Sequence, residues 1–124
     1  MDAARITTQL AAEFPGKRII RLPAEDPAEI IVEIGGTADE GLAIAIIDRS
    51  APHVHRKMTE VYEVELGILR VHVDGETQTL EAGECLTIRP GQVHWAEGDA
   101  TRLLVRSTPP WTASDHIVVD RTGS

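Results

Sequence analysis

The sequence has one cysteine, few aromatic residues and fewer basic than acidic residues. Because Cys85 has no second cysteine to pair with, no intrachain disulfide can form and nothing favours an oxidising compartment. Lys and Arg total 12 against 20 Asp and Glu, a formal net charge of −8. This balance argues against nucleic-acid or anionic-membrane partners, which reward clustered basic residues. Aromatic residues make up only 3% of the chain, which weakly disfavours an aromatic substrate. Of the partner classes considered, small molecules are the one that this composition favours.

Long hydrophobic runs are also missing. No segment approaches the length needed to cross a bilayer, and residues 1–16 lack a basic segment followed by an apolar run. We therefore expect a cytoplasmic protein. The chain has 124 residues, 42% of them hydrophobic and 26% charged, which is ordinary globular composition. We expect a single domain over residues 1–124.

The hydrophobic pattern predicts one helix followed by many short strands. In residues 2–14 apolar side chains recur every three or four positions, and Pro15-Gly16 then ends the helix. Asp74-Gly75 is a strong hairpin signal. The spacing of roughly ten residues between turns is typical of an antiparallel sandwich or barrel. The expected strands are 17–22, 29–34, 42–49, 61–66, 68–73, 77–80, 84–88, 94–96 and 102–107.

Two histidines and a glutamate stand at strand spacing in the middle of the chain. His53 and His55 lie two residues apart, so on a strand both imidazoles point to the same side. Glu60 follows, and Tyr62 lies on the same face of the next strand. His94 comes after a Pro-Gly turn and is a fourth candidate. Imidazole and carboxylate groups are typical ligands of transition metals, so this pattern predicts a metal site.

These residues also resemble the two sequence motifs of the cupin family. The first motif is His-x-His, three or four residues, Glu, six residues and Gly, which His53, His55, Glu60 and Gly67 match in full. The second motif is matched by Gly83, Gly91 and His94, whereas Arg89 stands where Pro is usual and Gly98 where Asn is usual. Neither departure falls on a ligand position. The resemblance extends over residues 43–108.

The resemblance implies an all-β fold, a double-stranded β-helix jelly-roll barrel, with a short N-terminal helix. Residues 1–41 would hold the helix and first strands, 42–108 the barrel and 109–124 a tail. Many cupins form homodimers in which an N-terminal strand extends the partner's sheet, so we expect a homodimer formed through residues 17–22 or 29–34.

Three imidazoles and one carboxylate would hold one divalent transition metal per chain. Zn, Mn, Fe, Ni and Cu suit these ligands about equally well, so the sequence does not select the metal. Two adjacent coordination positions would stay open for water or substrate, as in catalytic sites.

Three further residues are candidates for the chemistry. Tyr62 could act as a general base, or donate to a developing oxyanion, if a nearby cation lowers its pKa; otherwise it is a core aromatic. Lys57 lies in the turn before Glu60 and could bind an anionic substrate, although charged turn residues are usually solvated. Arg106 could supply a carboxylate clamp, although its strand pattern places it outside. We expect His72 to lie at the surface and His116 to lie at the surface or at an interface. We expect Cys85 to be a small core residue.

The pattern of Lys57, Thr59, Glu60 and Tyr62 resembles small single-domain cupins that are isomerases, tautomerases or lyases. It implies a metal-dependent enzyme with Lewis-acid and proton-transfer chemistry on a small oxygenated substrate, such as a sugar or carboxylate. A dioxygenase with Fe or Cu at the same ligands is one alternative. The other is a non-catalytic, metal-dependent binding protein for a small molecule.

Overall fold

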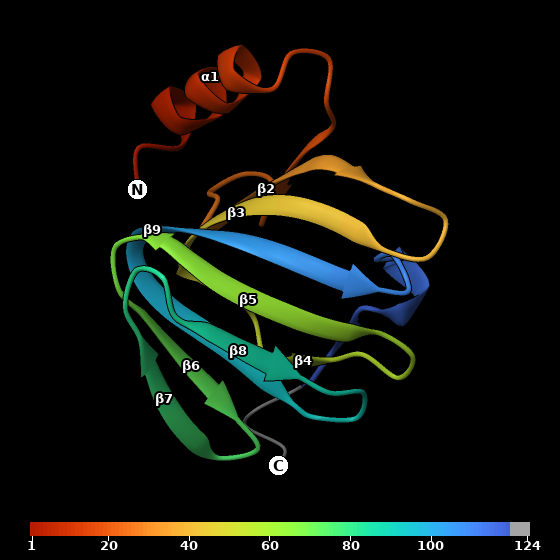
Figure 1. The fold of residues 1–124 in the computed structure, drawn as a ribbon. Coiled ribbons are helices and arrows are strands. Elements are labelled where there is room, and N and C mark those ends of the chain that lie inside the picture. Colours follow the sequence, from red (N-terminus) through yellow and green to blue (C-terminus); the bar gives the residue numbers. More distant parts are fainter. Residues whose placement is uncertain (120–124) are drawn as a thin grey trace.

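The computed structural model describes residues 1–119, which form one α-helix and ten strands curled into a barrel (Figure 1). All strand pairs are antiparallel, and the jelly-roll expectation is confirmed. Residues 120–124 of the expected tail lie outside the described residues. The elements are α1 (Ala3–Glu13), β1 (Ile19–Leu22), β2 (Glu29–Gly36), β3 (Gly41–Arg49), β4 (His53–Val54), β5 (Thr59–Leu66), β6 (Leu69–Val73), β7 (Glu76–Leu80), β8 (Cys85–Ile88), β9 (His94–Thr108), a 3₁₀ turn η1 (Ala113–Asp115) and β10 (Ile117–Val118).

The long strand β9 joins the two sides of the barrel. Its second half, residues 101–108, lies between β3 and β5, and its first half, residues 94–98, pairs with β6 and, at His94, with β4. The sequence predicted two strands here, separated by a turn, and this is wrong. A Cβ at Gly98 would lie 2.4 Å from Thr101 Oγ1 and 3.0 Å from the Ile47 carbonyl oxygen. Glycine at position 98 therefore lets β9 bend sharply within the sheet, and its register with β3 shifts there.

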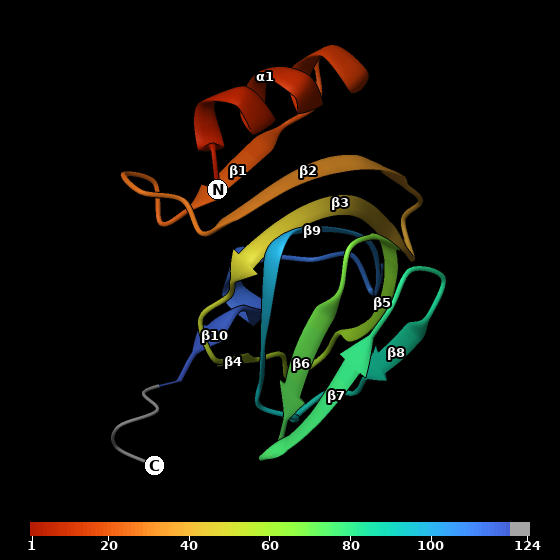
Figure 2. The ribbon, with the colours of Figure 1, turned by 90° about the vertical axis from the view of Figure 1, so that its left-hand side faces the viewer.

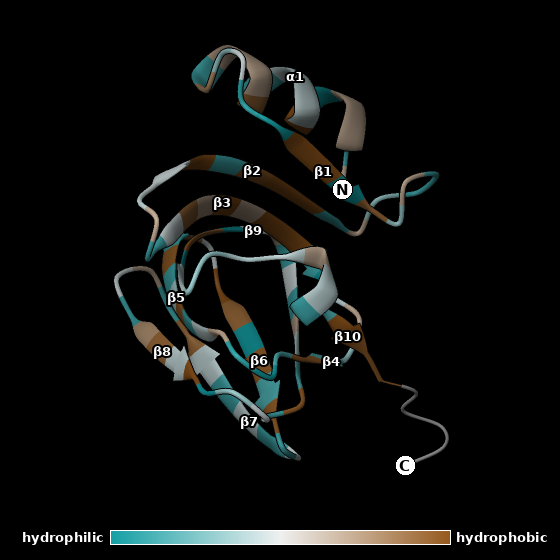
Figure 3. Cartoon of the chain, turned by 90° about the vertical axis from the view of Figure 1, so that its right-hand side faces the viewer, coloured by the Kyte–Doolittle hydropathy of each residue, from teal (hydrophilic) through white to brown (hydrophobic). Residues whose placement is uncertain are grey.

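Strand β3 separates two hydrophobic clusters because its side chains alternate between faces. Ala45 and Ile47 face the barrel interior, whereas Ile44 and Ile46 pack under α1. Figure 3 shows this apolar character along β2 and β3 beneath the helix. The pattern explains why the expected strand 42–49 is apolar at nearly every position. It also places the helix on the outside of the barrel, away from the interior.

The first helix begins and ends near the predicted positions. The Asp2 carboxylate accepts the backbone N–H of Arg5 at 3.1 Å, as an N-cap does. At the other end, Arg102 on β9 pairs with Glu13 at 2.5 Å and with Glu65 at 3.0 Å.

The described residues contain no helix long and apolar enough to span a membrane.

The C-terminal segment folds back onto the barrel. Strand β10 pairs with β4, with Val118 opposite His53, and Figure 2 shows the two strands side by side. The segment therefore docks on its own chain.

The expectation that Cys85 lies in the core is wrong, because its side chain is exposed; on β8 the buried position is Ile88.

Candidate metal centre

Four side chains from three strands meet inside the barrel. His53 on β4 lies opposite His94 on β9, His55 follows β4, and Glu60 is the second residue of β5. Their potential ligand atoms all lie within 4.8 Å of one another. All four side chains are buried, with His94 fully so. The structure thus brings together the four residues that the sequence predicted as ligands.

Each histidine is held by a backbone carbonyl on its outer side. The Nδ1 atoms of His53, His55 and His94 lie 2.7, 2.7 and 3.0 Å from the carbonyl oxygens of Ala51, Asp115 and Gln92. A carbonyl only accepts, so each Nδ1 carries the hydrogen and each Nε2 is left with a lone pair. Such outer contacts set the tautomer and orientation of metal-binding histidines.

Apart from one hydrogen bond between His94 Nε2 and Glu60 Oε1, the atoms that face the middle of the centre are acceptors. Glu60 Oε1 lies 3.1 Å from His94 Nε2 and 3.4 Å from His55 Nε2. The Nε2 atom of His55 is buried and has no hydrogen-bond partner among the described residues. Three lone pairs and a carboxylate at one point are satisfied by a cation. The residues present fit the divalent transition metal that the sequence predicted, although they do not identify it.

Local electrostatics favour the metal-binding protonation state of two of the four candidate ligands, His53 and Glu60. Burial, followed by the neighbouring His94, lowers the pKa of His53 to about 3. Burial pushes the pKa of Glu60 upward, but His55 and His94 outweigh it and bring it to about 2. Burial also opposes a charge on His55, yet Glu60 raises the pKa of that ring. At neutral pH His53 is thus neutral and Glu60 ionised, as metal binding requires.

Asp115 of η1 holds the turn that separates the ligands. Its carboxylate accepts the backbone N–H groups of Arg56 at 2.9 Å, Lys57 at 3.2 Å and Met58 at 3.0 Å. Its carbonyl is also the one that orients His55. Sequence reasoning missed this residue, because no local pattern connects position 115 to a turn almost sixty residues earlier.

Replacing Asp115 with alanine should weaken metal binding by about 10- to 100-fold, the usual effect of losing an outer contact to a ligand. The three backbone N–H groups would lose their acceptor, so the turn between His55 and Glu60 would loosen. Competition against a chelator would measure the affinity. Asp39→Ala is the matched control, because Asp39 is exposed between β2 and β3 and its backbone N–H donates to Thr37. Unchanged affinity in Asp115→Ala would contradict this role.

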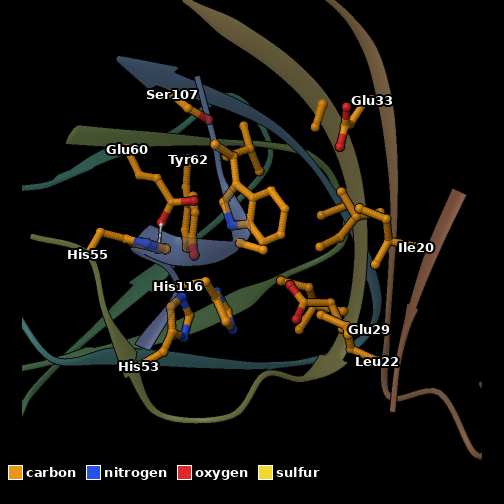
Figure 4. Close-up of a pocket in the computed structure, with 17 residues that line it drawn as sticks. Ile20, Leu22, Glu29, Glu33, His53, His55, Glu60, Tyr62, Ser107 and His116 are labelled. Carbon is orange, nitrogen blue, oxygen red and sulfur yellow. Dashed lines mark ion pairs between the residues drawn. The ribbon is translucent and has the colours of Figure 1, made fainter. Parts of the chain in front are cut away.

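A cavity of about 190 Å³ opens beside the metal centre (Figure 4). Its inner wall carries His53, His55, Glu60 and Tyr62, while η1 and the segment around it close one side. The opposite wall is formed by β1, β2 and β3 and is largely apolar. The apolar side chains of that wall are Ile20, Leu22, Ile31, Ala43, Ala45 and Ile47.

Tyr62 lies on the cavity wall, as strand alternation predicted. Its side chain is 4% exposed. Burial, then the negative charges of Glu60 and Glu29, raises the pKa of its phenol well above 10. Without a metal the hydroxyl is therefore protonated, which favours a proton-donor role over a general-base role. Its participation in catalysis stays a prediction.

The two basic candidates lie away from the cavity. Lys57 is exposed in the turn, where only its backbone contacts Asp115. Arg106 is also exposed and pairs with Glu40 at 3.4 Å. Neither residue lines the cavity, and no other Lys or Arg of residues 1–119 does. The structure therefore offers no basic anchor for an anionic substrate.

Two cavity residues were missed by sequence reasoning. Glu29 starts β2 and faces inward with Ile31, whereas the alternate residues of β2 pack under α1. Strand alternation could have revealed this. His116 was expected at the surface or an interface, but it lines the cavity, and its ring stacks on His53 with centroids 4.5 Å apart. No sequence signal pointed to that contact.

Comparisons with known proteins agree with this fold. A family profile described as a cupin domain matches residues 46–105. No curated protein matches the sequence. Among solved structures, Streptomyces Pac13 with uridine is similar with a TM-score of 0.76 and 12% identity, over 86% of this chain and 88% of that one.

Two further solved structures are similar at slightly higher identity. KdgF from Halomonas sp. has a TM-score of 0.66 and 18% identity, over 74% of this chain and 87% of that one. An RmlC-like cupin from Shewanella frigidimarina has a TM-score of 0.65 and 20% identity, over 80% and 88%. At these identities the likeness concerns the fold alone.

Proposed function

The chain is a small single-domain cupin, and from this we propose that it is a metal-dependent enzyme that moves protons on a small oxygenated molecule. The observation that carries the proposal is the cluster of three Nε2 lone pairs and one carboxylate beside a cavity. A divalent metal held by His53, His55, Glu60 and His94 would supply Lewis-acid polarisation of a carbonyl or hydroxyl group. The reaction class that fits is an isomerase, tautomerase or lyase.

The chain's own residues would provide the remaining functions. The phenol of Tyr62 holds a proton beside the metal ligands, where it can be given to a developing oxyanion. The apolar wall formed by β1 to β3 excludes water from the cavity, which strengthens electrostatic interactions inside it. Pac13 is described as a nucleoside dehydratase, and similar elimination chemistry would suit this arrangement, but the 11% identity carries no substrate assignment.

A dioxygenase using Fe or Cu is the second candidate, because the wall facing the metal centre is apolar. A metal-dependent binding protein would use the same residues without turnover. The cytoplasmic location expected from the sequence stays a prediction.

Metal analysis followed by a turnover assay tests the proposal. The protein would be purified without chelator or nickel resin, and its metal content measured by mass spectrometry; we expect about one divalent transition metal per chain. The loaded protein would then be incubated with sugars, uronates and nucleosides in D₂O. Deuterium incorporation or elimination without oxygen uptake supports the proposal. Oxygen consumption would indicate a dioxygenase, and binding without any change of the ligand would indicate a binding protein.

We expect a homodimer built through β1. Within residues 1–119 this strand pairs only with β2, so its other edge is open to a partner strand. The alternative edge 29–34 is not free, because β2 lies between β1 and β3. Light scattering at about 10 μM should give twice the chain mass of 13.5 kDa. A monomeric mass would contradict this prediction.

A further inference from the structure

A carboxyl group without a partner lies on the apolar wall opposite the metal centre. Glu29 pairs through its backbone with Leu22 of β1 and Ile47 of β3, and Figure 4 shows its side chain pointing into the cavity. Among residues 1–119, its carboxyl group makes no hydrogen bond or ion pair. A polar group in apolar surroundings costs free energy unless something pairs with it. Glu29 is therefore poised for a partner that enters the cavity.

The protonation state of Glu29 suits it to hydrogen bonding. Burial, followed by the negative charge of Glu60, raises the pKa of Glu29 to about 8. Near pH 7 the carboxyl group is mostly neutral, so it can both donate and accept a hydrogen bond. When a donor such as a hydroxyl or ammonium group approaches, it can also ionise and accept more strongly.

The charges around the cavity discriminate between ligands. The titratable groups that line it besides Glu29 are His53, His55, His116, Tyr62, Glu33 and Glu60. Burial, then His55, lowers the pKa of His116, so that ring is neutral at pH 7. Among residues 1–119, the only Lys or Arg side chain paired with this set is that of Arg18, which lies outside the cavity wall, 3.8 Å from Glu33. A negative group at the Glu29 end would find no cation there.

We propose that Glu29 is a substrate-binding residue that selects molecules carrying a hydroxyl, amide N–H or ammonium group at the end remote from the metal. One end of the substrate would reach the four-ligand centre, its middle would contact Ile31 and Ile47, and its far end would bind Glu29. Carboxylates and phosphates at that end are disfavoured because they would lose their water without gaining a cation, and above pH 8 the ionised Glu29 would also repel them. This inference rests on the proposed function and narrows it to substrates that are neutral or cationic at one end.

The test compares three small probes that share a hydroxyketone head. Dihydroxyacetone ends in a hydroxyl group, whereas hydroxypyruvate and dihydroxyacetone phosphate end in anions. Ligand-detected NMR would give the dissociation constant of each probe, with and without metal. We expect dihydroxyacetone to bind at least about tenfold tighter than either anion, the equivalent of one strong interaction. Tighter binding of the anions to both forms of the protein would overturn the inference.

Three variants test whether Glu29 causes the difference in affinity between the neutral and anionic probes. Glu29→Gln keeps size and hydrogen bonding, so the neutral probe should bind within about threefold of the unmodified protein near pH 7. At pH 9, where Glu29 is ionised, the anions should bind about tenfold tighter to the variant than to the unmodified protein. Glu29→Leu removes the hydrogen bond and should weaken the neutral probe about tenfold. Glu76→Gln, on the exposed face of β7 and outside the cavity lining, is the matched control and should change the binding of neither kind of probe. Equal binding of all probes by Glu29→Gln and the unmodified protein at pH 9 would overturn the inference.

Thermal unfolding of the metal-free protein gives an independent readout. The raised pKa of Glu29 means that the folded state holds a proton which the unfolded state releases near pH 4.5. Stability from this proton is complete below pH 4.5 and is lost as pH rises through about 8. The melting temperature of Glu29→Gln should therefore gain on that of the unmodified protein by at least about 5 °C between pH 5.5 and pH 9. Parallel curves would overturn the inference.

These results separate the inference from the proposed function. If the chain takes up no metal, the proposed enzyme fails, yet the ranking of the probes on the metal-free protein still decides the role of Glu29. If the protein binds metal and turns over a substrate, but the anionic probes bind tighter than the neutral probe in every variant, the proposed enzyme function is supported and the proposed role of Glu29 is contradicted.

Discussion

Replacing His55 with alanine is expected to reduce bound metal from about one equivalent per chain to none. The change removes a ligand atom that is buried without a hydrogen-bond partner, and it also releases the Nδ1 contact to the Asp115 carbonyl. We expect metal affinity to fall by more than the roughly 10- to 100-fold typical of outer contacts. Mass spectrometry after purification and titration with Zn²⁺ would measure both content and affinity.

His72→Ala is the matched control for this variant. His72 lies on the outside of β6, where it hydrogen-bonds Glu97 at 2.7 Å and stacks on Trp95. Its loss should leave metal content unchanged. Because a small residue at position 55 leaves a hole near the centre, His55→Gln provides a variant of similar volume. A full equivalent of metal in either His55 variant would refute the assignment of this ligand.

Replacing Tyr62 with phenylalanine should lower kcat by about 10²- to 10⁴-fold, the usual contribution of a positioned acid or base. The change deletes one oxygen and keeps the ring, which packs against Val64 and Val105 in the barrel core. Fold and metal content should therefore stay the same. Deuterium exchange by the metal-loaded protein, on whichever substrate the panel identifies, would measure the loss.

Two readouts distinguish a catalytic role for Tyr62 from a packing role. The melting temperature reports packing, and it should change little. If kcat of Tyr62→Phe stays within about threefold of the unmodified protein, the phenol is not the proton donor, and another group on the cavity wall must move the proton.

The ligand set could be predicted from the sequence because short-range geometry determines it. A two-residue spacing on a strand sends His53 and His55 to one side, and the same rule aligns Glu60 with Tyr62. The position of His94 relied on the motif as well, since its pairing with β4 spans about forty residues. Sequence spacing could not place Lys57 and Arg106. A charged side chain next to a motif has the same spacing whether it faces the cavity or solvent, and both of these face solvent.

The rest of the site depends on contacts that no local pattern records. Asp115 and His116 reach the centre only because β10 pairs with β4 and returns the C-terminal segment to the barrel. The bend of β9 at Gly98 has the local sequence of a turn, because glycine and aspartate are both typical turn residues. Alternation along β2 separates Glu29 and Ile31 from Ile30 and Val32, but which of the two faces lines the cavity depends on α1 covering the other one.

The return of the C-terminal segment means that the working unit is larger than the stretch its relatives share. The family profile covers residues 46–105 and thus contains all four candidate metal ligands. It omits Asp115, whose carboxylate shapes the ligand loop, and β1 and β2, which close the cavity. A protein trimmed to residues 46–105, or another barrel carrying that stretch, would keep the metal-binding side chains. It would lose the segment that orients them and the strands that form the cavity for the small molecule. Protein engineers should therefore keep residues 1–119 together, because α1 covers the outer face of β2 and β3.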